Sequence, residues 1–138
     1  MYLLDTNIIS ELRKGDRANP GITRFFGQMA EQEATSYLSA ITIGELRRGV
    51  DIIQHRGDFA QAQALESWLQ TILDNYAENI LDFGREEAQV WGKLRVPHPE
   101  NALDKQIAAT ALVYGLILVT RNVKDFVATG VTLLNPFE

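Results

Sequence analysis

Several carboxylate side chains stand at places along the chain where they could meet and hold a cation. Asp5, Glu45 and Asp125 each come directly or shortly after an apolar segment that is typical of a β-strand. Glu45 is expected in the first turn of the helix that follows its strand. The carboxyl ends of parallel strands share one edge of a sheet, and ligands of such folds bind beyond that edge. The three acids are therefore expected to project toward it.

A fourth acid, Asp104, stands on a predicted helix rather than at a strand end. It shares a helical face with Ile107, Ala108 and Ala111, and this apolar face is expected to pack inward. A carboxylate on an inward face is costly unless a partner neutralises it. The neighbouring Lys105 points about 100° away around the helix. Asp104 therefore needs a cation that its own helix does not supply.

The chemistry that suits such a group of acids is the binding of a hard divalent ion. Four carboxylates without a counter-charge would raise one another's pKa. Mg²⁺ or Mn²⁺ prefers oxygen ligands and would remove that conflict. One or two such ions would activate water and stabilise a phosphodiester under in-line attack. A thiolate or histidine-rich zinc site is not expected, because the chain has no cysteine and His55 and His98 lie far apart.

Each strand-end acid also has a purely structural interpretation. Asp5 could cap a helix, since aspartate is a preferred N-cap residue. Thr42 and Glu45 have the spacing of a capping box, in which Glu45 reaches back to the start of its own helix. Asp125 could be a turn residue. These interpretations stay open for each residue alone, but together they leave the convergence of the acids unexplained.

The elements that must position these acids alternate along the chain, which predicts an α/β fold with a mostly parallel central sheet flanked by helices on both faces. We expect residues 1–138 to form a single domain. The predicted strands are 2–4, 35–40, 80–83, 116–120 and 131–134. One helix is predicted directly after Asp5. The other predicted helices cover about residues 20–29, 42–53, 58–76, 86–95 and 101–114.

Composition sets limits on location and partners. No run approaches the ~18 apolar residues of a membrane span. The start of the chain has no basic region before its apolar run, so no signal peptide is indicated and a cytoplasmic location is expected. The net charge of −5 argues mildly against a nucleic-acid partner. That objection weakens if several of the acids hold cations, because bound metal inverts the local charge.

Segments that carry these acids resemble the motifs of the PIN-domain ribonuclease toxins of the VapC and FitB type. Each motif alone is weakly specific, but they occur in order and at the expected spacing from Met1 to the end of the chain. The matching segments are Leu4–Ser10 (LDTNIIS), Leu38–Gly49 (LSAITIGELRRG), Asp104–Ala111 (DKQIAATA), Thr120–Phe126 (TRNVKDF) and Leu134–Pro136 (LNP).

The resemblance implies a PIN fold, usually dimeric, and the activity of an Mg²⁺- or Mn²⁺-dependent endoribonuclease. It implies the role of toxin in a type II toxin–antitoxin pair, with an antitoxin of the VapB or FitA kind that blocks the acidic pocket. Operator DNA would then be bound only through the antitoxin. Substrates in this family are structured RNAs, commonly tRNA anticodon loops or a ribosomal RNA loop.

Residue by residue, Asp5, Glu45 and Asp104 match the three firmest acidic positions of the family. The fourth acid stands at the position of Asn122 in some relatives and of Asp125 in others. Because Asn122 is neutral here, we assign the role to Asp125, with Asn122 as a possible ligand or hydrogen-bonding neighbour.

Residues with hydroxyl groups and residues with basic side chains lie beside the acids in the sequence. Thr6 and Thr120 could orient carboxylates or water, although both are also ordinary strand-end and cap residues. Arg121 and Arg48 are candidates for holding RNA phosphates. Solvated surface charge is the alternative for both arginines.

Other functions compete with the toxin hypothesis. A phosphoacceptor or phosphatase domain also gathers acids at strand ends, but it predicts a second acid directly after Asp5, where the chain has Thr6-Asn7. If the chain were an inactive PIN-fold binding module, the ligand acids would be expected to be lost. The three firmest acidic positions, Asp5, Glu45 and Asp104, are all present. A PIN nuclease outside a toxin–antitoxin system is disfavoured by the short, single-domain length.

Overall fold

The centre of the molecule is a five-stranded, fully parallel sheet with the strand order β3-β2-β1-β4-β5. The structure, a computed structural model, describes residues 1–137. The expected parallel sheet is confirmed, although every strand except the first is shorter than predicted. The strands are β1 (Tyr2–Leu4), β2 (Ser36–Ser39), β3 (Ile80–Leu81), β4 (Ile117–Val119) and β5 (Leu133–Leu134).

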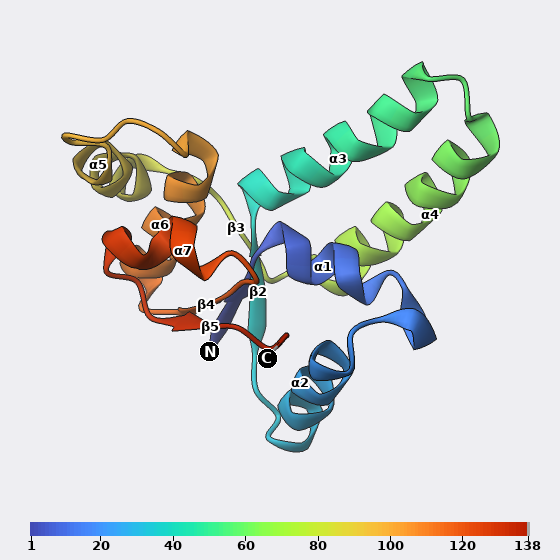
Figure 1. Cartoon of the computed structure of the whole chain (residues 1–138), viewed down its shortest axis with the longest axis horizontal. Coiled ribbons are helices and arrows are strands. Elements are labelled where there is room, and N and C mark those ends of the chain that lie inside the picture. The colour runs from blue at the N-terminus through green and yellow to red at the C-terminus, as the bar shows by residue number, and fades with distance from the viewer. Residues whose placement is uncertain (138) are drawn as a thin grey trace.

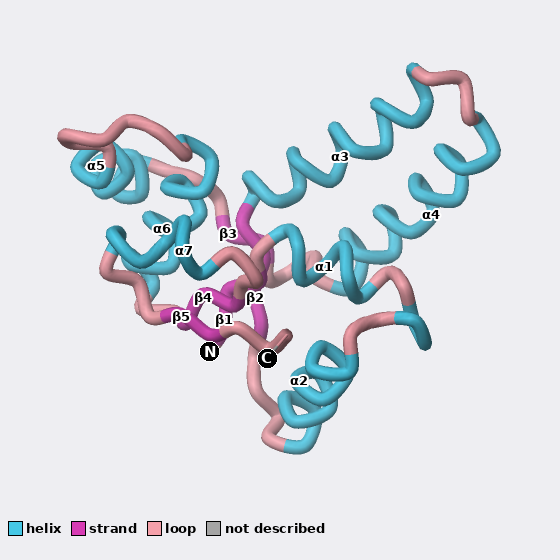
Figure 2. The backbone as a smooth tube through the Cα atoms, viewed as in Figure 1, coloured by secondary structure: helices cyan, strands magenta, loops and turns pink. Residues whose placement is uncertain are grey.

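Helices surround this sheet, and two of them form a long hairpin that projects from one side (Figure 1). Figure 2 shows this hairpin, α3–α4, on the opposite side of the strands from α5 and α6. The α-helices are α1 (Thr6–Leu12), α2 (Pro20–Glu31), α3 (Ala40–His55), α4 (Phe59–Asn75), α5 (Arg85–Leu94), α6 (Ala102–Tyr114) and α7 (Val123–Phe126). Single 3₁₀ turns cover Gly15–Arg17 and Val127–Thr129.

Apolar residues on the two faces of the sheet build two cores. Successive strand residues point to opposite faces, and β1 shows this directly. Leu4 packs with buried residues of α1 to α4, whereas Leu3 packs with buried residues of α6 and α7, among them Ile107 and Phe126. Leu3, Leu4, Ile107 and Phe126 are all fully buried. The expectation of helices on both faces is therefore confirmed.

Local signals fix several helix ends. Asn19 caps α2 by accepting a hydrogen bond from the Gly21 N–H at 2.8 Å, and Pro20 occupies the first helical position, where its missing N–H costs nothing. Gly115 ends α6 with a φ of +66°, in the left-handed region that favours glycine. None of the described helices combines the length and the apolar character that crossing a membrane requires.

Gly21 offers a test of how the C-terminal segment packs on α2. A Cβ atom at Gly21 would lie 1.9 Å from the backbone oxygen of Pro136, whereas a Cβ at Gly27 would meet nothing within 4 Å. We expect Gly21→Ala to destabilise the protein by about 2 kcal/mol or more, because backbone must move. Gly27→Ala should stabilise it by about 0.5–1 kcal/mol through helix propensity. Urea unfolding of both variants and of the wild type measures these changes in the free energy of unfolding. Equal stability of the two variants would contradict the packing described.

Candidate active site

Asp5 lies at the carboxyl end of β1 and is almost fully buried, with 4% of its surface exposed. Its Oδ1 accepts a hydrogen bond from the Thr6 N–H at 2.8 Å, so Asp5 does cap α1. Its Oδ2 accepts from the Thr120 hydroxyl at 2.8 Å and from Asn7 Nδ2 at 3.3 Å. Burial raises the pKa of Asp5, these hydrogen bonds oppose the rise, and the charge of Glu45 adds to it.

Glu45 lies in the second turn of α3, not in the first turn as predicted, because α3 begins at Ala40. Ser39 is the N-cap and accepts from the Ile41 N–H at 3.0 Å. The alternative interpretation of Thr42 and Glu45 as a capping box is therefore wrong. Glu45 Oε1 instead accepts from the Thr6 hydroxyl at 2.9 Å, so it faces the end of β1.

Asp104 stands in the first turn of α6, half-buried, on the same face as the fully buried Ile107, Ala108 and Ala111. The predicted inward face is thus confirmed. No described residue donates a hydrogen bond or an ion pair to the Asp104 carboxylate. Burial raises its pKa to about 6, and the charges of Asp5 and Asp125 contribute to the rise.

Asp125 lies on α7, a short helix that sequence patterning missed because four residues are too few to show a helical period. Asn122 precedes this helix as its N-cap residue, and its carbonyl accepts from the Asp125 N–H at 3.0 Å. The Asn122 N–H donates to the Thr120 hydroxyl at 3.0 Å. Asp125 is exposed, and its charge acts on Asp104.

The four acids thus form a series in which the charge of each acts on a neighbour: Glu45 on Asp5, and Asp5 and Asp125 on Asp104. Within residues 1–137, no three acidic or histidine side chains lie close enough together to enclose a metal ion, so the described side chains do not form the cluster that the sequence predicts. None of the four acids forms an ion pair with a described residue. Carboxylate oxygens without an ion-pair partner are the kind of donor that a hard divalent cation prefers.

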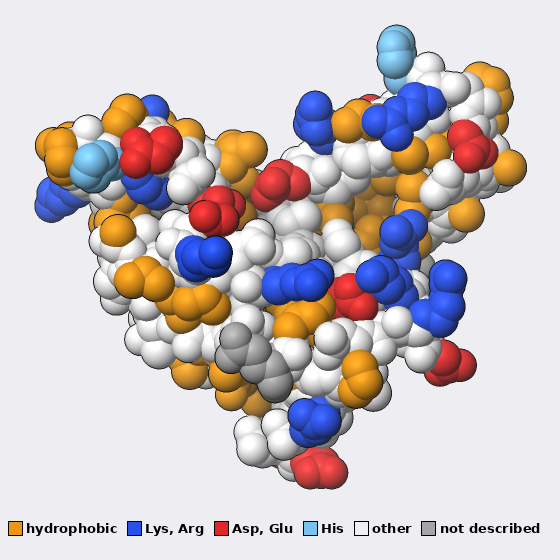
Figure 3. Space-filling view, in the orientation of Figure 1, with side chains coloured by type: hydrophobic (Ala, Val, Ile, Leu, Met, Phe, Trp, Pro, Cys, Tyr) orange, Lys and Arg blue, Asp and Glu red, His pale blue; other side chains and the backbone are white. Residues whose placement is uncertain are grey.

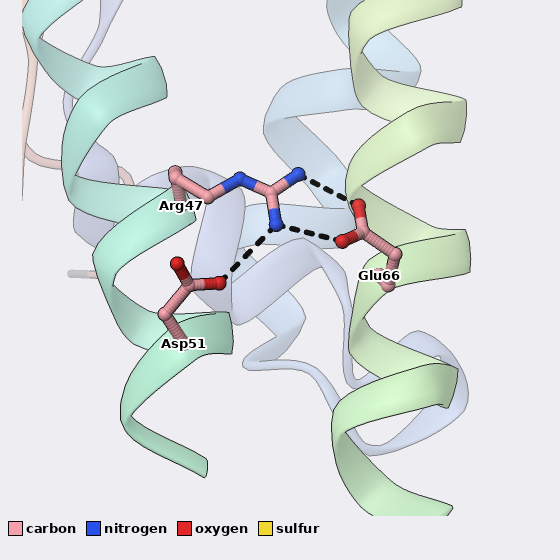
Figure 4. Close-up of polar contacts among 3 residues, drawn as sticks. All are labelled: Arg47, Asp51 and Glu66. Carbon is pink, nitrogen blue, oxygen red and sulfur yellow. Dashed lines mark hydrogen bonds and ion pairs between the residues drawn. The ribbon is translucent and has the colours of Figure 1, made fainter. Parts of the chain in front are cut away.

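Arg47, two residues after Glu45, pairs with acids outside the candidate site, as Figure 4 shows. Its guanidinium makes two hydrogen bonds of 2.7 Å to Glu66 on α4 and one of 3.3 Å to Asp51 one turn further along α3. This bidentate pair ties the two helices of the hairpin together. Arg48, the next residue, is exposed and pairs with no acid in the described part of the chain.

Arg121 lies beyond β4, directly after Thr120. Its backbone N–H donates to Asn7 Oδ1 at 3.2 Å. Its exposed guanidinium lies over the ring of Phe137, 4.9 Å from the centroid. Arg121 is therefore fixed at the edge of the acidic site both by its backbone and by a cation–π contact.

The surface around the acids is hollowed. Figure 3 shows acidic side chains on both sides of the notch between α3 and the α6–α7 side, with basic side chains beside them. A largely apolar groove of about 260 Å³ starts at Thr6 and Glu45 and runs between α1, α3 and α4. The groove therefore opens directly beside the acidic site.

Fold, acidic edge and sequence together identify the class. The PIN domain family model matches residues 2–130, and the chain belongs to the PIN-domain family. Within it, the chain is similar to a VapC ribonuclease, Y4jK, of Sinorhizobium fredii, with 32% identity over 100% of this chain and 99% of the relative. It is also similar to Toxin FitB of Neisseria gonorrhoeae, with 34% identity over the same shares of both chains. It is thus a PIN protein of the VapC and FitB type.

Solved structures support this assignment. The crystal structure of FitAcB from Neisseria gonorrhoeae matches with a TM-score of 0.85 and 33% identity, covering 100% of this chain and 99% of the other. The structure of FitAB bound to an IR36 DNA fragment matches with a TM-score of 0.78 and 30% identity, covering 100% and 96%. The predicted PIN fold is confirmed.

Proposed function

We propose that this chain is a divalent-metal-dependent endoribonuclease that acts as the toxin of a type II toxin–antitoxin pair. The observation that carries the proposal is the series of four uncompensated acids, from four separate segments, along the carboxyl edge of the sheet. Full-length similarity to a VapC ribonuclease and to a FitB toxin supports it. In this proposal residues 1–138 form one PIN domain that carries the complete site.

The cation ligands in this proposal are Asp5, Glu45, Asp104 and Asp125, with Mg²⁺ or Mn²⁺ as the ion. When bound, the ion lowers the pKa of its water and stabilises negative charge on a phosphodiester. The chain's contribution is to hold the carboxylates: Thr120 donates to Asp5, and Thr6 donates to Glu45. Hydrogen bonds of this kind orient ligands and sustain their basicity.

The substrate in this proposal is a structured RNA, such as a tRNA or ribosomal RNA loop. Water attacks the phosphorus in line, and the bond to the opposite oxygen breaks. Both oxygens of Asp104 are free of protein donors in the described residues, so this carboxylate has room for a cation and for a water. The exposed Arg121 and Arg48 are candidates for the flanking phosphates, since each offers a guanidinium without a carboxylate partner.

The partner in this proposal is a cognate antitoxin of the VapB or FitA kind, which occupies the acidic pocket. Operator DNA is then bound through the antitoxin, in keeping with the FitAB complex on DNA. We also propose a homodimer, as is usual for the family.

Expression of this chain alone is expected to arrest bacterial growth, and co-expression of the antitoxin encoded beside it should restore growth. The physical reason is that a tightly bound partner covers the acids and excludes RNA. Growth curves and gel analysis of total RNA measure both effects. Growth arrest without RNA cleavage by the purified chain in Mg²⁺ or Mn²⁺ would refute the ribonuclease assignment.

A further inference from the structure

Asn7 joins the ends of two strands through a single side-chain amide. It lies in the first turn of α1. Its Nδ2 donates to Asp5 Oδ2 at 3.3 Å and to Thr120 Oγ1 at 3.4 Å, while its Oδ1 accepts from the Arg121 N–H at 3.2 Å. Thr120 and Arg121 are 113 and 114 residues away in the sequence. One amide therefore connects the segments after β1 and after β4.

We propose that Asn7 is a positioning residue of the metal site: it fixes the orientation of the Asp5 carboxylate and ties the loop after β4 to α1. The inference rests on the proposed function and adds to it a residue that touches neither ion nor RNA. Asn7 acts through Asp5 on one side and through the loop that leads to Asp125 on the other.

The hydrogen bonds around Asn7 allow only one orientation of its amide. The Thr120 hydroxyl gives its single hydrogen to Asp5 Oδ2 and accepts from both Asn7 and the Asn122 N–H. Its donor and both lone pairs are then used. Turning the Asn7 amide over would place its oxygen against Asp5 and its NH₂ against the Arg121 N–H, losing all three contacts. The contacts therefore fix the orientation of the amide.

These contacts also decide which part of Asp5 remains for a cation. Oδ2 accepts from Thr120 and Asn7, so both of its lone pairs are in use, whereas Oδ1 accepts only from the Thr6 N–H. Oδ1 thus keeps one lone pair. Without Asn7, Oδ2 would regain a lone pair and the carboxylate would have a weaker constraint against rotation. We expect metal affinity to fall as a result.

The second effect of Asn7 passes along the loop after β4. Arg121 is held by its N–H, and Asn122 by the bond of its N–H to Thr120. Asn122 is the N-cap residue of α7 and accepts from the Asp125 N–H. The position of α7, and with it Asp125, is therefore coupled to α1 through Asn7.

Ordinary helix stability does not explain Asn7. Asp5 already caps α1 with its own carboxylate, so the Asn7 side chain is not needed to start the helix. Asparagine is also one of the weaker helix formers. Its presence at this position therefore costs helix propensity, and the contacts to Asp5, Thr120 and Arg121 offset that cost.

Asn7→Leu tests the proposal, because leucine has a similar shape and no hydrogen-bonding groups. We expect the dissociation constant for Mn²⁺, measured by electron paramagnetic resonance of free Mn²⁺, to rise roughly 10–100-fold. In RNA cleavage, kcat should fall by a larger factor than KM for RNA rises, because Asn7 bonds the backbone N–H of Arg121 and not its guanidinium. Thr129→Val is the matched control, since it removes a buried hydroxyl whose hydrogen bonds join Phe126 and Val131 and involve none of the four acids. It should leave Mn²⁺ affinity unchanged.

A second readout, taken without metal, tests the hydrogen bond of Asn7 itself. The Arg121 amide is on an exposed residue, and Asn7 is its hydrogen-bond acceptor. In the metal-free wild type this amide should exchange with solvent slowly, and in Asn7→Leu it should exchange at the rate of an open loop. Unprotected exchange in the wild type, or wild-type Mn²⁺ affinity in Asn7→Leu, would overturn the role of Asn7 alone. A wild type that neither binds Mn²⁺ nor cleaves RNA would overturn the proposed function, and this inference with it.

Discussion

Asp104→Asn is expected to abolish RNA cleavage and growth inhibition while the protein stays folded. Loss of a residue that merely orients a metal ligand typically costs about 10–100-fold, so loss of a direct ligand should cost roughly 100-fold or more. Asparagine keeps the shape of aspartate but removes the charge that a hard cation needs. Single-turnover cleavage of RNA in saturating Mg²⁺ measures the effect. Asp16→Asn, an exposed acid of the first 3₁₀ turn, is the control and should cleave normally.

The same substitution should make the metal-free protein more stable at neutral pH. The pKa of Asp104 rises from 3.8 to about 6 on folding, so the folded state binds the extra proton between these values. The contribution of Asp104 to stability therefore falls as the pH rises through this window, and the loss is complete above about pH 6. The shift corresponds to roughly 3 kcal/mol in full. Solvent screening of a half-buried group reduces it to about 1 kcal/mol.

Urea unfolding of wild type and Asp104→Asn in chelator, at pH 5 and at pH 7.5, isolates this contribution. The variant should gain its advantage mainly at the higher pH. The comparison cancels the acids that respond in the opposite sense, such as Glu11, whose pKa is lowered first by its hydrogen bond from Lys14. A variant that is less stable than wild type at pH 7.5, or that still cleaves RNA, would contradict the role given to Asp104.

Removal of divalent metal is the second change with a large expected effect. EDTA should stop RNA cleavage completely, and excess Mg²⁺ or Mn²⁺ should restore it. The ions should also stabilise the fold, because they bind the native arrangement of acids and not the unfolded chain. At an ion concentration 100 times the dissociation constant, the gain is about 2.7 kcal/mol. Thermal unfolding with and without metal measures it.

The stabilisation by metal should depend on the proposed ligands. Asp5→Asn and Asp104→Asn should each remove most of the metal-dependent rise in unfolding temperature, whereas Asp16→Asn should keep it. Full cleavage activity in chelator would point to a metal-free mechanism. A rise in unfolding temperature that survives in both ligand variants would place the ion elsewhere on the protein.

Much of the fold could be predicted from short-range patterns. The strand Tyr2–Leu4, the start of α2 at Asn19-Pro20 and the end of α6 at Gly115 all follow from apolar runs and cap residues, which act over a few neighbouring positions. The inward face of Asp104 follows from helical spacing. The predicted boundaries were less accurate where two polar residues could each cap a helix. Ser39, rather than Thr42, is the N-cap of α3.

The gathering of the acids could be predicted only as a tendency, because strand ends share an edge in any parallel sheet. The strand order β2-β1-β4 decided which of them became neighbours, bringing Thr120 against Asp5. The tertiary structure also decided that Thr6 holds Glu45 and that Arg47 binds Glu66 on the next helix. No local rule links residues so far apart in the sequence.

The amino-acid sequence by itself thus determined the class of fold, since this depends on residue type and on spacing within each element, and it supplied the acids and the kind of ion as predictions. Only the tertiary structure decided the side-chain contacts of Asn7, which cross from α1 to the loop after β4. The physical reason is that hydrogen bonds between distant segments exist only after the sheet has brought strand ends to within a few ångströms. Local propensity carries no information about which ends will meet.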